Sequence, residues 1–120
     1  MSFEIRWPSK VPVSEFSPEF AQSMANRMAM SYFKYGLVRD NAHKFDNVAS
    51  IKARLALYEE TGNMEHLADM ANFAMIEFIV PNHPQAHFRP TDSDESPGLI
   101  ELEEQLMSYW DDKAIDPVKD

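Results

Sequence analysis

The fold class is decided by residues 61–81, which read TGNMEHLADMANFAMIEFIVP. The Gly-Asn pair at the start is typical of one helix ending and the next being capped, and Pro81 ends the apolar run. The residues between them favour a helix over 64–80. A helix that is apolar on most sides is buried, in a bundle or in an oligomer interface. We therefore expect Phe73 and Phe78 both to be buried.

The chain upstream of this stretch predicts two more helices. Ser17 suits the cap of a helix over 18–35, which Gly36 ends, and Asp46 suits the cap of a helix over 47–60. The stripe of the first helix comprises Phe20, Met24, Met28, Ser31 and Tyr35. The apolar stripe of the second comprises Val48, Ile51, Leu55 and Tyr58.

The ends of the chain complete the predicted organisation. Residues 1–16 contain alternating apolar positions and two prolines, which indicates an extended arm or an edge strand. Leucines at helical spacing predict a further helix over 97–110. We expect loops over 37–45 and over 81–96 between the helices. We expect an all-α domain over 17–110, with about four helices in a bundle-like arrangement, and a flexible acidic tail over 111–120.

Composition excludes several classes of function. The 120 residues contain no cysteine, which excludes disulfide scaffolds, thiolate metal sites and cysteine nucleophiles. The net charge is −9 and the 11 basic residues are scattered, so we expect no binding to duplex nucleic acid or to membranes. The longest apolar stretch, around 73–80, is too short to span a bilayer. With no basic segment before an apolar run at the start, we expect a cytoplasmic location.

Polar residues in the helix over 64–80 are the main candidates for chemistry. At about 100° per residue, Glu65, Asp69 and Asn72 share one helix face. Asp69 lies too deep to cap the helix, so its partner lies outside its own helix. One interpretation is a Mg²⁺ site on Glu65 and Asp69, both also candidate catalytic residues, because Mg²⁺ prefers carboxylates with phosphate and water. The other is that Glu65 caps the helix while Asp69 and Asn72 bind Arg54, a tyrosine or backbone groups.

A second cluster surrounds the end of the helix over 18–35. Cations there favour the helix dipole, or they bind phosphate beside the carboxylates. The candidate ligand-binding residues are Asn72, Lys34, Tyr35, Arg39 and Arg54. His83 and His87 make a weak metal candidate, and the Asp92-x-Asp94 pair is interpreted as a turn.

Three strings carry a resemblance to known proteins. They are RLALYEETGNMEHLADMANFAMIEF (54–78), MSYFKYG (30–36) and HPQAHFRPTDSDESPG (83–98). Over residues 1–98 the chain resembles a group of small phage and bacterial proteins that carry no assigned activity.

A more distant resemblance concerns the order of the motifs. A helix ending in KYG, a second helix, and then Glu65-x-x-x-Asp69 followed by Ala71-Asn72 resembles MazG-like all-α nucleoside triphosphate pyrophosphohydrolases. That resemblance implies a helical oligomer that hydrolyses nucleotides with Mg²⁺. The family spaces its acids i, i+3 on two helices, whereas this chain has i, i+4 spacing and no E-x-x-E pair within 47–60.

Three functions stay open at this point. The first is a phage-type nucleotide pyrophosphohydrolase, in which Lys34 and Arg39 neutralise phosphate charge. The second is a non-catalytic helical protein of a mobile element that sequesters a nucleotide-like ligand or inhibits a host protein. The third is a structural or regulatory adaptor with no small-molecule site. The surplus apolar surface of the helices over 18–35 and 64–80 predicts a homo-oligomer.

Overall fold

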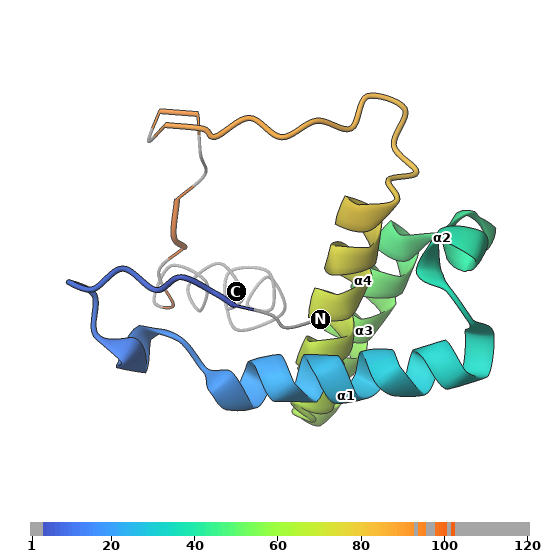
Figure 1. Ribbon diagram of the computed structural model, residues 1–120, viewed down its shortest axis with the longest axis horizontal. Coiled ribbons are helices and arrows are strands. Elements are labelled where there is room, and N and C mark those ends of the chain that lie inside the picture. Colours follow the sequence, from blue (N-terminus) through green and yellow to red (C-terminus); the bar gives the residue numbers. More distant parts are fainter. Residues whose placement is uncertain (1–3, 93, 96–97, 101, 103–120) are drawn as a thin grey trace, which may run out of the picture. The chain divides into compact units, whose positions relative to one another are not determined.

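Figure 1 shows the order of the helical elements along the chain. The computed structural model describes residues 4–92, 94–95, 98–100 and 102. The chain divides into two units, residues 1–86 and residues 87–120. The labelled α-helices all belong to the first unit, and the described residues contain no strand. The prediction of an all-α fold is thus confirmed.

Helix α1 (Pro18–Tyr35) begins and ends where its flanking residues predict. The Ser17 hydroxyl accepts a hydrogen bond from the backbone N–H of Phe20 at 3.0 Å. Gly36 ends the helix with a φ of 86°, a conformation that favours glycine. Its N–H donates to the carbonyl oxygen of Tyr32 at 2.8 Å.

The segment between α1 and α3 is helical, although the sequence predicts a loop there. It forms α2 (Val38–Asn41) and a 3₁₀ turn, η2 (Ala42–Lys44). The Asn41 side-chain amide donates to the carbonyl oxygens of Tyr35 at 2.6 Å and Leu37 at 3.0 Å. Helices of one turn are too short to show an apolar period, so this segment has no periodic signal in the sequence.

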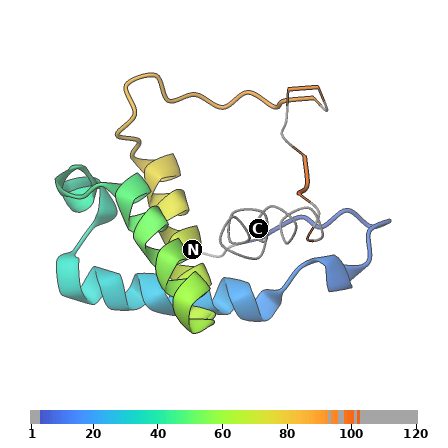
Figure 2. The ribbon, with the colours of Figure 1, turned by 180° about the vertical axis from the view of Figure 1, so that it is seen from behind.

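Helices α3 (Asn47–Thr61) and α4 (Glu65–Ile79) form an antiparallel pair (Figures 1 and 2). The Asp46 carboxylate caps α3 by accepting from the N–H of Ala49 at 2.9 Å. Gly62 ends α3 in the left-handed conformation, with a φ of 72°. The pair is therefore a helical hairpin with predictable boundaries.

Helix α4 is central to the first unit. It contacts α3 along its length, and α1 crosses it (Figure 2). The buried residues of α4 are Ala68, Asp69 and Asn72, and two of these three are polar. The contact between the helices is therefore partly hydrogen-bonded rather than wholly apolar.

The apolar core of the first unit is small. Its buried apolar residues are Ala42 and Ala68, at 5% and 3% exposure. Phe73 is half-buried, but Phe78 is 73% exposed, so the prediction that Phe78 is buried is wrong for the single chain. At about 100° per residue, Phe78 lies about 180° around the helix from Asp69, opposite the face that α1 and α3 cover.

The N-terminal arm is held locally by its tryptophan. The Trp7 indole N–H donates to the carbonyl oxygen of Val11 at 2.8 Å, and its ring lies 5.5 Å from the ring of Phe16. A 3₁₀ turn, η1 (Val13–Glu15), separates this contact from α1. The arm is therefore structured by its own residues before the first helix begins.

The second unit contains the turn predicted at Asp92. The Asp92 carboxylate accepts from the N–H groups of Asp94 at 2.9 Å and Glu95 at 3.1 Å. Residues 98–100 are not helical, and most of the helix predicted over 97–110 lies outside the described residues, as does the tail over 111–120. Within the described part of the chain, every helix is too short or too polar to cross a membrane.

Candidate functional site

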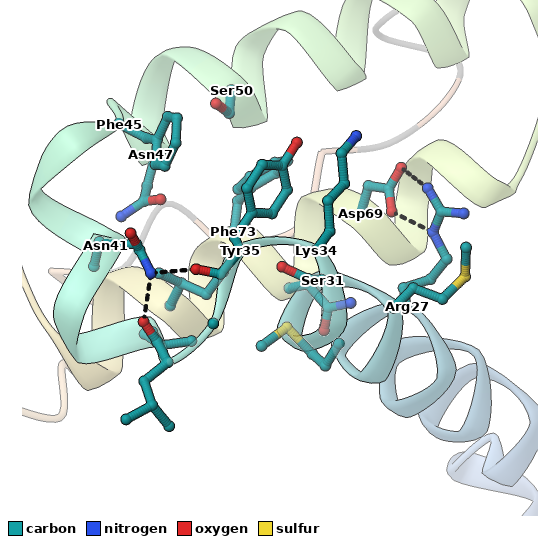
Figure 3. A pocket seen from close by; sticks show the side chains of 18 of the residues that line it. Arg27, Ser31, Lys34, Tyr35, Asn41, Phe45, Asn47, Ser50, Asp69 and Phe73 are labelled. Atoms are coloured by element: carbon teal, nitrogen blue, oxygen red, sulfur yellow. Dashed lines mark hydrogen bonds and ion pairs between the residues drawn. The ribbon is translucent and has the colours of Figure 1, made fainter.

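A pocket of about 420 Å³ lies between α1, α3 and α4, with α2 and η2 at one end (Figure 3). Its charged and polar lining includes Arg27, Lys34, Tyr35, Arg54, Asp69 and Asn72. All of these except Arg27 belong to the predicted site. The fold therefore brings most of the predicted residues together in one cavity.

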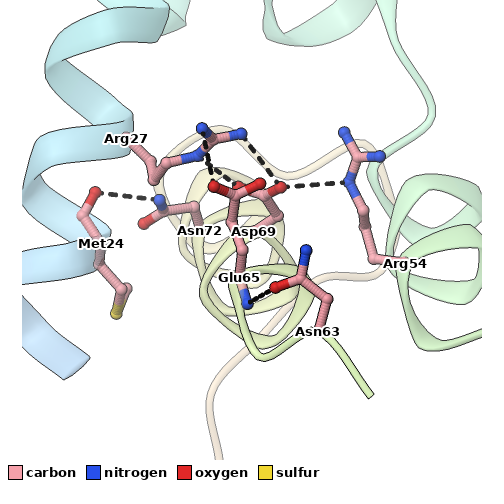
Figure 4. Close-up of polar contacts among 7 residues, drawn as sticks. All are labelled: Met24, Arg27, Arg54, Asn63, Glu65, Asp69 and Asn72. Carbon is pink, nitrogen blue, oxygen red and sulfur yellow. Dashed lines mark hydrogen bonds and ion pairs between the residues drawn. The ribbon is translucent and has the colours of Figure 1, made fainter. Parts of the chain in front are cut away.

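Asp69 lies between two arginines that come from different helices (Figure 4). Its Oδ1 accepts from Nε of Arg27 at 3.0 Å, and its Oδ2 accepts from Nη2 of the same side chain at 3.3 Å. Nε of Arg54 lies 3.5 Å from Oδ2. Asp69 thus has partners outside its own helix, as its depth in α4 requires.

Arg27 reaches Asp69 because it lies on the inner side of α1. It shares that side with Met24, three residues before it, and with Met28, the residue after it. The hydrogen bond to Asp69 is the main cause that raises the pKa of Arg27 above its ordinary value, and burial opposes it. Arg27 therefore stays charged at every physiological pH.

Glu65 stands one turn before Asp69 and contacts the same arginine. Its Oε2 lies 3.5 Å from Nη1 of Arg27. Its backbone N–H donates to the side-chain oxygen of Asn63 at 3.0 Å, although the residue at the cap position of α4 is Met64, which makes no side-chain cap bond. Glu65 does not line the pocket, but it supplies a second negative charge beside Arg27.

Asn72 offers a free acceptor in the buried part of the pocket. Its Nδ2 donates to the carbonyl oxygen of Met24 in α1 at 3.0 Å (Figure 4). Its Oδ1 is buried without a hydrogen-bond partner among the described residues, and the side chain is 6% exposed. Because a buried unpaired acceptor is costly, this oxygen is suited to receive a donor from a ligand or water.

Arg54 faces α4, although the sequence analysis placed it outside the apolar stripe of α3. Its guanidinium lies 5.8 Å from the centroid of the Phe73 ring, in addition to its contact with Asp69. Val48 and Leu55, predicted as stripe residues, are half exposed at 50% and 42%. The inner face of α3 is therefore rotated toward its polar residues.

Aromatic side chains line the end of the pocket near α2. The rings of Tyr35 and Phe45 meet edge to face, with centroids 6.1 Å apart. Nζ of Lys34 lies 5.1 Å from the centroid of Tyr35. Figure 3 shows Lys34 and Tyr35 extending beside each other from the end of α1. A ligand at this end of the pocket could therefore contact the rings of Tyr35 and Phe45 and the ammonium group of Lys34.

The lining carries more positive than negative charge. Arg27, Lys34 and Arg54 are opposed by one carboxylate, Asp69. The chain as a whole has a net charge of −9, so the positive charge of the pocket lining is opposite in sign to the charge of the whole protein. A concave site with converging cations attracts anions.

Arg39 lies apart from this cluster. It lines a neighbouring groove of about 410 Å³, together with Tyr32, Leu37 and Ile79. The two cavities share residues of α1 and α2, such as Ser31 and Val38. Of the predicted ligand-binding residues, Arg39 is therefore the one that does not line the main pocket.

The two carboxylates predicted to bind Mg²⁺ both contact Arg27. Within the described residues, no three side chains of the histidine, aspartate or glutamate type gather as metal ligands, and this includes His83 and His87. A divalent cation at Asp69 would lie beside two guanidinium groups and would be repelled by them. The donor set in this arrangement fits an arginine pair better than Mg²⁺, whose ligation by Glu65 and Asp69 stays a prediction.

Two residues important to the site were not identified from the sequence. Arg27 was missed because the stripe of α1 was defined by its apolar members, although a charged residue between Met24 and Met28 is a signal that it has a partner. Asn47 was missed because it begins α3 and resembles a capping residue. Its Nδ2 donates to Oε1 of Glu77 at 3.0 Å, and this contact links α3 to the end of α4.

Comparison of the chain with models of protein families, with curated proteins and with solved structures finds no significant match.

Proposed function

We propose that the protein binds a nucleotide-like anionic ligand in the pocket between α1, α3 and α4. The observation that supports this most strongly is the convergence of Arg27, Lys34 and Arg54 on a cavity that holds a single carboxylate. In a chain of net charge −9, such a surplus of cations favours a negatively charged ligand.

The other groups of the pocket suit the remaining parts of a nucleotide. The rings of Tyr35, Phe45 and Phe73 offer faces and edges to a base. The unpaired Oδ1 of Asn72 accepts a donor, such as a sugar hydroxyl or a base amine. Binding is favoured over hydrolysis because Asp69 already holds two arginines.

Hydrolysis of a nucleoside triphosphate is the second candidate. Glu65 and Asp69 do lie together, since both contact Arg27, and they would hold Mg²⁺ if the arginines turned toward phosphate. The test is release of pyrophosphate from each nucleoside triphosphate in the presence of Mg²⁺. Turnover that disappears in Glu65→Gln and Asp69→Asn supports the enzyme, and no turnover of any nucleotide removes it.

Ligand binding is tested by thermal melting with a panel of nucleotides. We expect a nucleotide to raise the Tm of the wild type and to have no effect on Arg54→Gln. Lys52→Gln is the matched control, because Lys52 is an exposed cation on the same helix and lines neither cavity. A wild type whose Tm is unchanged by every nucleotide would contradict the proposal.

We also propose that the protein acts as a homo-oligomer in the cytoplasm. Phe33 and Phe78 are 85% and 73% exposed, at the ends of α1 and α4. Large exposed apolar side chains on adjacent helices favour association, since their burial is worth about 25 cal/mol per Å². A host protein is the alternative partner for this surface, and a clean monomer in solution would favour it.

A further inference from the structure

The arginines of the pocket differ in how many of their donors are already used. In Arg27, Nε and Nη2 bond to Asp69, and Nη1 faces Glu65 at 3.5 Å. All three nitrogens of this guanidinium therefore have a carboxylate partner. Arg27 serves to hold the two acids and has little left to offer a ligand.

Arg54 is the opposite case. Its Nε faces Asp69 at 3.5 Å, and its two Nη groups are directed away from that carboxylate (Figure 4). The ring of Phe73 lies 5.8 Å from the guanidinium carbon. The contacts with Asp69 and Phe73, which lie one turn apart on α4, hold the guanidinium beside that helix and leave the donor fork of Nη1 and Nη2 available to an anion.

Lys34 is the second cation with donors left for a ligand, and no ion pair joins it to a carboxylate within the described residues. Its Nζ lies over the ring of Tyr35 and lines the same cavity as Arg54. The two side chains come from different helices, α1 and α3. An anionic group between them would compensate two positive charges that no acid of the described chain neutralises fully.

The charge of the lining limits the charge of the ligand. Three cations and one carboxylate leave two positive charges, and Glu65 beside Arg27 offsets part of that surplus. A phosphate monoester carries about −1.5 to −2 at pH 7, which matches this balance. A triphosphate carries more charge and requires a metal ion for compensation, and two guanidinium groups oppose a metal ion at Asp69.

We infer that the pocket takes a nucleoside monophosphate as a bare anion, its phosphate on Arg54 and Lys34, with Asp69 as an internal counter-ion that positions Arg54. This inference rests on the proposed nucleotide-binding function and narrows it to one class of ligand. The acceptor Oδ1 of Asn72 then receives a donor of the sugar or the base, so the nucleoside part contributes to affinity as well.

Calorimetric titration of the full chain at constant ionic strength tests the inference. The ligands are the four common ribonucleoside monophosphates, their triphosphates, the nucleosides, ribose 5-phosphate and inorganic phosphate, each with EDTA and with Mg²⁺. We expect a monophosphate to bind in EDTA with a Kd that Mg²⁺ changes by less than about twofold. Its nucleoside and inorganic phosphate should each bind at least about tenfold more weakly.

Variants assign the roles of the residues. Arg54→Gln should weaken monophosphate binding at least about tenfold, and Arg54→Lys less, because lysine keeps the charge but not the fork. If Arg54→Gln fails to fold, Lys34→Gln tests the same phosphate site, because Lys34 is exposed and its substitution should not disturb the fold. Lys52→Gln should leave the Kd unchanged.

Asp69→Asn separates a counter-ion from a metal ligand. Removing its charge makes the lining more positive, so in EDTA the preference for monophosphate over triphosphate should fall or reverse. A merely structural role would weaken both ligands equally. If triphosphates bind only with Mg²⁺ and monophosphates do not bind, the inference is overturned while nucleotide binding stands.

Two further outcomes overturn the inference in other ways. Inorganic phosphate that binds as tightly as every monophosphate would indicate a phosphate site that does not recognise nucleosides. If no nucleotide binds in either buffer, both the inference and the proposed function fail.

Discussion

Asp69 in α4 and Arg27 in α1 form a two-point hydrogen-bonded ion pair, with distances of 3.0 Å and 3.3 Å, across 42 positions of the sequence. Among the described residues, this pair and the contact of Asp69 with Arg54 are the ion pairs that join different helices within the pocket. The pair ties the first helix of the unit to the last.

The first prediction concerns the stability of this pair. Asp69→Asn should lower the free energy of unfolding by about 2 kcal/mol, between the values for exposed and buried pairs, because Arg54 loses its counter-ion and Arg27 keeps only Glu65. The Arg27 side chain is 35% exposed and that of Asp69 10%, which places the pair between the two cases. Urea titration measures the loss, with Glu59→Gln on the exposed side of α3 as control. A variant as stable as the wild type would show that the negative charge of Asp69 does not stabilise the fold and serves only in ligand binding.

The second prediction concerns acid pH. Hydrogen bonds from the Asn47 amide, and then from the backbone N–H of Asn82, lower the pKa of Glu77 below its ordinary value. A carboxylate with a lowered pKa stabilises the fold above the pKa of the unfolded chain, and this contribution is lost as the pH falls through the lowered value. The Tm difference between wild type and Glu77→Gln should therefore shrink between about pH 5 and pH 3. Glu60→Gln should show no such trend, and a constant difference for Glu77→Gln would contradict the assignment.

The third prediction concerns association. The mass in solution should exceed the 13.8 kDa of one chain at micromolar concentration, because the ends of α1 and α4 expose large apolar side chains. Phe33→Asp should reduce the mass to that of a monomer while circular dichroism stays unchanged. Val13→Asp is the control, since Val13 is 78% exposed on the arm before α1. A monomeric wild type in light scattering would remove the oligomer.

The fourth prediction concerns the end of the pocket at α2. Asn41→Ala removes three hydrogen bonds, two to the carbonyl oxygens of Tyr35 and Leu37 and an exposed one from Lys44, and should cost about 1–2 kcal/mol in unfolding free energy. Nucleotide affinity should fall too, because Asn41 holds the wall that carries Tyr35. Asn26→Ala, on the exposed side of α1, removes only an exposed hydrogen bond from Gln22, so it should cost less stability and leave the affinity unchanged. Equal melting temperatures for the two variants would show that the hydrogen bonds of Asn41 do not contribute to stability.

The boundaries of the helices could be predicted from the sequence because they depend on local chemistry. Ser17 and Asp46 each bond to a backbone N–H three residues later, and Gly36 and Gly62 each take a positive φ. These contacts involve neighbours in the chain, so their signals are short motifs. The central position of α4 could be predicted for a related reason, since its apolar content requires partners.

The rotation of each helix could not be predicted in the same way. The inner face of α3 carries Arg54 rather than Leu55, and that of α1 carries Arg27, because polar contacts with Asp69 decide both rotations. A stripe defined by apolar residues alone does not include charged residues such as Arg27 and Arg54, so it misses the ion pairs that they form. The prediction for Phe78 was wrong for the same reason, since the side of α4 that carries Asp69 faces α1 and α3 and Phe78 lies on the opposite, exposed side.

The polar seam along α4, formed by Asp69 and Asn72, has a consequence for how the unit finds its register. Each side chain bonds to a fixed point on α1, Arg27 for the first and the carbonyl of Met24 for the second. A slip of α4 by one residue would break both bonds at once, whereas leucines in their place would tolerate several alignments. The polar seam therefore specifies a single register of α4 against α1, although apolar residues in its place would bind the two helices more strongly.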